Sequence, residues 1–106
     1  MKLVYMCFVS NGFDDHYRSL VCSSMNAGEF LTSVVKEYGK AAALLTDAAA
    51  PYFIALNLDT LKATSLGFFK LEKDGKIFAP TGRGQFSGKP ASPDDIRERA
   101  EQMFNE

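Results

Sequence analysis

Asp14, Asp15 and His16 form the one cluster in this sequence that joins acids to the chain's single histidine. Histidine is a natural general base near neutral pH, and an aspartate often orients it. Neighbouring residues on a strand point to opposite faces, however, so Asp15 and His16 do not converge unless the strand bulges. We therefore interpret the cluster as a polar hairpin tip and predict no catalytic residue. A hydrolase or metal enzyme ranks behind two binding hypotheses.

The two cysteines, Cys7 and Cys22, are the other reactive side chains. A hairpin centred between Asp14 and Asp15 would place them opposite each other, because both lie equally far from that centre. They form no C-x-x-C motif, and no pair of residues has the spacing of zinc ligands. We interpret them as buried thiols and predict neither a metal site nor a cofactor. Whether they meet in space stays open.

Residues 81–89, Thr-Gly-Arg-Gly-Gln-Phe-Ser-Gly-Lys, invite comparison with a phosphate-binding loop. That motif needs four residues between its glycines and a hydroxyl side chain after the lysine. Here five residues intervene, and Pro90 stands where the hydroxyl should be. What remains is a glycine-rich basic loop whose Arg83 and Lys89 precede a predicted helix. It favours an anion site, or a site for single-stranded nucleic acid, over a nucleotide-hydrolysing one; an ordinary connector is the competing interpretation.

Two phenylalanines lie in polar loops, Phe13 in Asn-Gly-Phe-Asp-Asp and Phe86 in Gly-Gln-Phe-Ser-Gly. A ring in such a loop either folds back into the core or anchors a partner, as interface hot spots do. Lys70, Lys76 and Phe78 add a basic and aromatic strand face nearby. Such a face docks an acidic partner or stacks on single-stranded nucleic acid, and otherwise is solvated. These residues, with Arg83 and Lys89, are the predicted binding residues.

Two helices are predicted. The central one covers residues 26–38, with Asn26 and Glu29 placed as a capping box and Gly39 as the exit. Its apolar positions recur at helical spacing, as a buried stripe requires; they are Ala27, Phe30, Leu31, Val34, Val35 and Tyr38. The C-terminal helix covers residues 93–104, with Ser92 as its cap and Pro93 at its first position.

Five strands are predicted. Three are single runs, and two are the arms of a hairpin; they cover residues 3–9, 16–24 and 52–58, and the segments on either side of the 73–75 loop. The first and third runs are apolar on both faces, which is typical of strands in the interior of a sheet.

The hairpin register places Leu71 opposite Ile77 and Glu72 opposite Lys76, with Gly75 left-handed. Residues 58–67 are interpreted as a connector. The alanine-rich stretch 40–50 is compatible with either a helix or an edge strand.

The chain of 106 residues is predicted to form one α+β domain, 1–106. Its fold is a mostly antiparallel sheet of about five strands with both helices on one face. A net charge of −1 argues against a protein dedicated to nucleic acid, although residues 60–91 carry six basic and two acidic side chains. No apolar run is long enough to cross a membrane, so a cytoplasmic location is expected.

The favoured function is a small non-catalytic module, of the inhibitor, immunity or adaptor type, that binds another protein. The alternative is an anion- or single-stranded-nucleic-acid-binding module that uses the loop 81–89. A homodimer formed through an exposed sheet edge is a further expectation.

Overall fold

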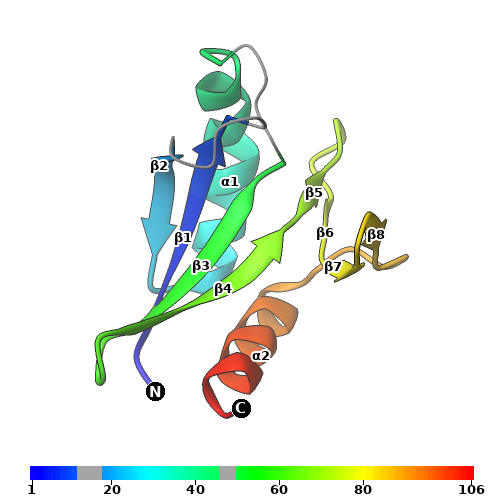
Figure 1. The fold of residues 1–106 in the computed structure, drawn as a ribbon. Helices are drawn as coiled ribbons and strands as arrows, with labels where there is room; N and C mark the ends of the chain where they lie inside the picture. Colours follow the sequence, from blue (N-terminus) through cyan, green and yellow to red (C-terminus); the bar gives the residue numbers. More distant parts are fainter. Residues whose placement is uncertain (12–17, 46–49) are drawn as a thin grey trace.

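A four-stranded antiparallel sheet and two helices form the body of the computed structural model, which describes residues 1–11, 18–45 and 50–106 (Figure 1). The strand order is β2-β1-β3-β4. The main elements are β1 (Leu3–Ser10), β2 (Arg18–Ser24), α1 (Ala27–Ala42), β3 (Tyr52–Asn57), β4 (Lys62–Phe68) and α2 (Pro93–Phe104). This arrangement confirms the predicted α+β class.

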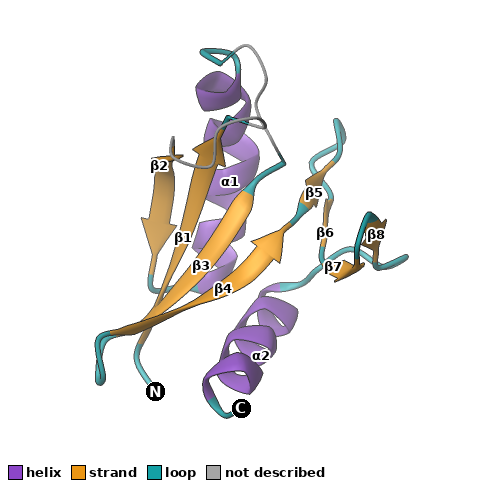
Figure 2. Ribbon diagram, viewed as in Figure 1, coloured by secondary structure: helices purple, strands orange, loops and turns teal. Residues whose placement is uncertain are grey.

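Two small ribbons follow the main sheet and are separate from it (Figure 2). They pair β5 (Lys70–Leu71) with β6 (Ile77–Phe78), and β7 (Pro80–Gly82) with β8 (Gln85–Phe86). The predicted hairpin therefore exists, with Leu71 opposite Ile77 as expected. It is not part of the main sheet, which has four strands rather than about five.

The main chain of this hairpin turn matches the prediction, whereas the side chains of Glu72 and Lys76 pair with other residues. Gly75 has a φ of +91°, and the Glu72 N–H donates to the Lys76 carbonyl at 2.9 Å. The Glu72 carboxylate, however, pairs with Lys70 at 3.3 Å, and Lys76 pairs with Asp74 at 3.6 Å. Glu72 and Lys76 are therefore opposite each other in the main chain, as predicted, but each side chain pairs with a residue two positions away.

β4 occupies most of the segment that was expected to be a connector. It pairs with β3 from Asn57↔Lys62 to Tyr52↔Phe68, with an irregularity beside Phe53. That irregularity leaves Leu66 fully buried in the core, and Gly67 adopts a φ of +103° next to it. A β-bulge with a left-handed glycine is a normal way for an edge strand to twist.

α1 begins as predicted but ends later. The Asn26 side chain accepts the Glu29 N–H at 3.0 Å, whereas the Asn26 N–H donates to the Ser24 hydroxyl at 3.0 Å rather than to Glu29. The helix continues through Gly39 to Ala42, so Gly39 is not its exit. Residues 40–42 are helical and 43–45 form a turn, which excludes an edge strand there; residues 46–49 lie outside the described part.

The core lies between the helices and one face of the sheet, which we call the inner face. Phe53 of β3 is fully buried, with its ring centroid 4.9 Å from that of Phe30 and 4.2 Å from that of Phe69. From the predicted stripe of α1, the structure buries Phe30, Leu31, Val34 and Tyr38.

Val35 belongs to the predicted stripe but is 43% exposed. It faces the β5–β6 turn instead of the sheet, and a Cβ added at Gly75 would lie 3.3 Å from its Cγ1. The turn can approach this closely because glycine has no side chain.

α2 has the predicted bounds and a complete capping box. The Ser92 hydroxyl accepts the Asp95 N–H at 3.2 Å, and the Asp95 carboxylate accepts the Ser92 N–H at 2.9 Å. The hydrogen bond from the Ser92 N–H, with a smaller contribution from the Ser92 side chain, lowers the pKa of the Asp95 carboxyl. The Arg99 Nε donates to the Leu66 carbonyl at 2.9 Å, which fastens α2 to β4 on the same face as α1.

Candidate functional site

The face of the sheet opposite the helices, which we call the outer face, carries a continuous set of apolar side chains. From Leu3 to Val9 of β1 and along β3, the residues alternate between buried positions on the inner face and half-buried positions on the outer face. No helix or strand among the described residues packs over the outer face; in Figure 2, α1 lies behind β1 and β2. The outer face comprises Val4, Met6, Phe8, Leu20, Tyr52, Ile54, Leu56, Ala63 and Phe68.

The strand register arranges one set of these side chains in a row that crosses the whole sheet. Phe8 is directly opposite both Leu20 and Tyr52, and Tyr52 is opposite Phe68. Four large apolar side chains therefore stand side by side from one edge strand to the other. The outermost two are well exposed, Leu20 at 53% and Phe68 at 39%.

Tyr52 is held in a fixed position within this row. Its ring centroid lies 4.7 Å from that of Phe68, and its hydroxyl donates to the Ser65 hydroxyl at 2.7 Å. The Arg18 guanidinium reaches across β1 and lies 4.4 Å from the Tyr52 ring centroid. A cation over an aromatic ring is attracted to the negative face of that ring. The outer face thus presents an ordered aromatic and arginine group inside an apolar row.

The charge on this face has a single sign. The four strands of the main sheet contain no Asp or Glu, and their only charged residues are Arg18 and Lys62. Tyrosine, phenylalanine, methionine and arginine are enriched at the centres of protein interfaces, whereas acidic residues are depleted there. The outer face therefore has the composition of an interface centre.

Three of the predicted binding residues come together on the small ribbons. The Lys70 ammonium lies 4.9 Å from the Phe78 ring centroid and 5.4 Å from that of Phe86. Both rings are half-buried, and Lys70 also pairs with Glu72. Lys76 pairs with Asp74 and is not part of this cluster. Because the lysine already has both rings and a carboxylate as partners, the cluster holds the two ribbons together.

Two of the other predicted binding residues belong to the basic loop 81–89. Arg83 and Lys89 are exposed, and the Lys89 N–H donates to the Ser87 hydroxyl at 3.2 Å. The helix N-terminus beyond the loop, which would attract an anion, is already occupied by the Asp94 and Asp95 carboxylates. Phe13, like the Asp14–His16 cluster, lies outside the described residues.

We therefore expect only weak, non-specific binding of random single-stranded DNA, with a dissociation constant in the micromolar range or above. At both low and moderate salt, the double variant Arg83→Ala/Lys89→Ala should bind this DNA as weakly as the wild type does. Fluorescence anisotropy titrations at two salt concentrations measure the dissociation constants of the wild type and of the double variant. Tight, salt-sensitive binding that the double variant loses would instead make the loop 81–89 the functional site.

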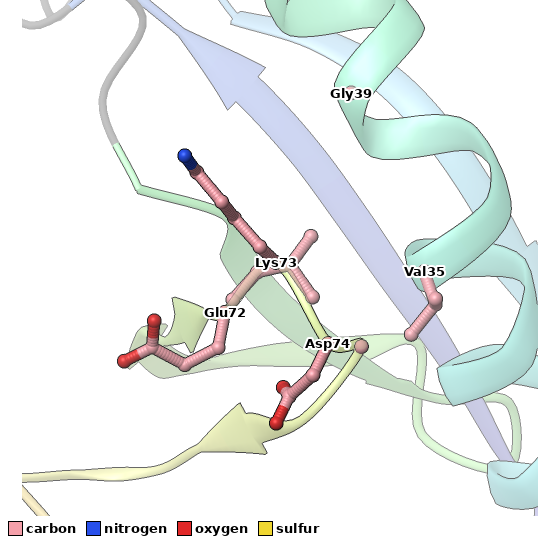
Figure 3. A pocket seen from close by; sticks show the side chains of 7 residues that line it. Val35, Gly39, Glu72, Lys73 and Asp74 are labelled. Carbon is pink, nitrogen blue, oxygen red and sulfur yellow. The ribbon is translucent and has the colours of Figure 1, made fainter.

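A cleft lies between α1 and the β5–β6 turn, with a volume of about 360 Å³ (Figure 3). Val35 forms one wall, and Glu72, Lys73 and Asp74 form the other. Both carboxylates are exposed and each is in an ion pair, and no Ser, Cys or His lines the cleft. Within residues 1–11, 18–45 and 50–106, no three metal-ligating side chains converge. The cleft therefore offers no hydroxyl, thiol or imidazole nucleophile and no metal-binding set of ligands among the described residues.

The outer face was not among the sites predicted from the sequence. The signal was present in the two runs that are apolar on both faces, but such runs are ordinarily interpreted as covered on both sides.

No helix in the described part of the chain is long and apolar enough to cross a bilayer. Comparisons of the chain with family models, with curated proteins and with solved structures found no match.

Proposed function

We propose that this protein is a non-catalytic module of the inhibitor, immunity or adaptor type, and that it binds another protein through the outer face of its sheet. The observation that carries the proposal is an apolar sheet face on which no described helix packs. β1 and β3 are apolar on both faces, yet the described helices cover only the inner one. We infer that the partner supplies the protein surface that packs on the outer face.

The size of the outer face supports this proposal. Four strands at ordinary spacing, each with about six residues, span roughly 19 Å by 20 Å, or about 400 Å². Patches of this size on single domains are often functional. A standard interface buries about 800 Å² on each partner, so the outer face would form its centre and the surrounding loops its rim.

The charges indicate the chemistry of the partner. Arg18 lies beside the aromatic row, and the main sheet has no carboxylate to neutralise it. An arginine at the border of an apolar patch is suited to a bidentate pair with a carboxylate. The proposed partner is therefore a protein with an apolar surface that is bordered by Asp or Glu.

Two other expectations are subordinate to this proposal. β2 and β4 are the outermost strands of the sheet, and a homodimer through one of these edges would leave the outer face available. A cytoplasmic setting agrees with two unpaired thiols. The alternative function, anion or single-stranded nucleic acid binding at the loop 81–89, has no structural observation that favours it.

Affinity capture from the native host with matched variants tests the proposal. Leu20→Ser removes an exposed apolar side chain from the outer face, and Leu44→Ser removes one that is 86% exposed at the end of α1. Both substitutions should change the free energy of unfolding by less than about 0.5 kcal/mol, as is usual for surface positions. We expect a protein that is captured by the wild type and by Leu44→Ser but lost with Leu20→Ser. Equal capture by all three would contradict the proposal.

A further inference from the structure

Cys7 and Cys22 lie directly opposite each other on β1 and β2. Directly opposed residues of an antiparallel pair share one face, and their Cα atoms are about 4.5 or 5.5 Å apart, depending on the kind of pair. Both separations fall within the range of roughly 4.4–6.8 Å that disulfides bridge. The register shift after Cys7 also gives the edge strand freedom to adjust. A bond between the two sulfurs therefore requires no rearrangement of the sheet.

The two thiols differ in their surroundings. Cys7 is fully buried, whereas Cys22 is half-buried on the edge strand. A hydrogen bond between the two side chains lowers the pKa of Cys22, although its partial burial and the nearby Glu37 carboxylate oppose this. The same hydrogen bond, together with burial, raises the pKa of Cys7. Cys22 is thus the thiol that ionises first, and it belongs to the more exposed of the two residues.

Tyr38 of α1 is another titratable group near Cys7. Burial raises the pKa of Tyr38 to about 12, so it stays a neutral phenol near neutral pH.

We propose that Cys7 and Cys22 are a modification site at which a hydroperoxide converts the two thiols into an intramolecular disulfide. The Cys22 thiolate attacks one peroxide oxygen; the S–O bond forms, the O–O bond breaks, and the leaving oxygen takes a proton. Cys22 is then a sulfenic acid. The Cys7 thiol loses its proton, its sulfur attacks the Cys22 sulfur, and hydroxide leaves and is protonated to water.

With hydrogen peroxide the balance is two thiols and one peroxide to one disulfide and two waters. The pair of sulfurs loses two electrons, and the peroxide gains them. An added dithiol reverses the reaction by thiol–disulfide exchange. The bond ties the edge strand β2 to β1, a central strand of the sheet, and this inference is independent of the proposed binding function.

The test treats dilute full-length protein with a small excess of hydrogen peroxide. Free thiols are then alkylated under denaturing conditions, and the cysteine peptides are identified by mass spectrometry. We expect a monomer in which the Cys7 and Cys22 peptides are linked with the loss of two hydrogens, and in which dithiothreitol restores both thiols. Oxidation of Met6 or Met25, which lie close to the two cysteines, is distinguished by mass, because it adds an oxygen whereas the disulfide removes two hydrogens. No reaction, a disulfide between two chains, or over-oxidised Cys22 with Cys7 still alkylated would each overturn the proposal.

Single variants test the assigned roles. In Cys7→Ala, the Cys22 sulfenic acid has no resolving thiol and should be trapped by dimedone. In Cys22→Ala, the buried Cys7 should react at least about tenfold more slowly than Cys22 does in the wild type, since exposure and thiolate character set the rate. Equal oxidation rates for Cys7 with and without Cys22 would overturn the assignment of Cys22 as the attacking sulfur.

Discussion

Val34→Asp is expected to unfold the protein or leave it barely stable at 25 °C. Val34 is fully buried on the inner side of α1, within the core that α1 forms with the sheet. An unpaired carboxylate there loses its hydration and gains no partner, at a cost of several kcal/mol. The total stability of an ordinary domain is only about 5–15 kcal/mol. Thermal melting followed by circular dichroism measures the effect.

Val35→Asp is the matched control, because it places the same charge one residue further along the same helix. Val35 is partly exposed and faces the β5–β6 turn, so its carboxylate would keep much of its hydration. We expect a loss of about 1 kcal/mol or less. If Val34→Asp melted within a degree or two of the wild type, the packing of α1 on the sheet would be wrong.

Phe53→Ala should lower the free energy of unfolding by about 3–5 kcal/mol, the usual cost of removing a fully buried phenylalanine. The ring is stacked on Phe69 at 4.2 Å between centroids and meets the edge of Phe30 at 4.9 Å, so the space it leaves cannot collapse easily. Urea denaturation gives the value.

Ile54→Ala is the control on the next residue of the same strand, which points to the outer face and is half-buried. Its loss should be clearly smaller, because less apolar surface is removed from contact with protein atoms. Equal losses for the two variants would mean that the outer face is as well covered as the core, contrary to the structure described here.

The helices could be predicted from the sequence because their signals are local. Asn26 and Ser92 are caps whose side chains accept a backbone N–H three residues on, and the structure shows both bonds. The end of α1 could not be predicted in the same way. Gly39 permits a helix to end but does not force it to, and the following alanines continue it.

β4 was missed because an edge strand does not need a continuous apolar pattern. Its residues Ala63, Thr64 and Ser65 are small or polar, and each of the three is exposed or half-buried. The fold shows why they form a strand: β3 needs a partner on its second edge, and β4 supplies the hydrogen bonds. The need of β3 for a hydrogen-bonding partner thus outweighs the weak strand propensity of these residues.

The candidate site depended on information that the sequence does not contain. The runs around Phe8 and Ile54 could be recognised as apolar on both faces, but the pattern does not say which face is covered. In the same way, Lys70 and Phe86 were selected for their residue types. Only the structure shows that the Lys70 ammonium lies 5.4 Å from the Phe86 ring centroid.

Site-specific photocrosslinking tests the outer face as the binding surface most directly. A photoreactive phenylalanine analogue replaces Phe68 on the outer face in one protein and Leu44, beyond α1, in a control. Irradiation in the native host should link the first to another protein and leave the second without that adduct. An adduct from the Leu44 position with none from the Phe68 position would contradict the assignment of the outer face as the binding surface.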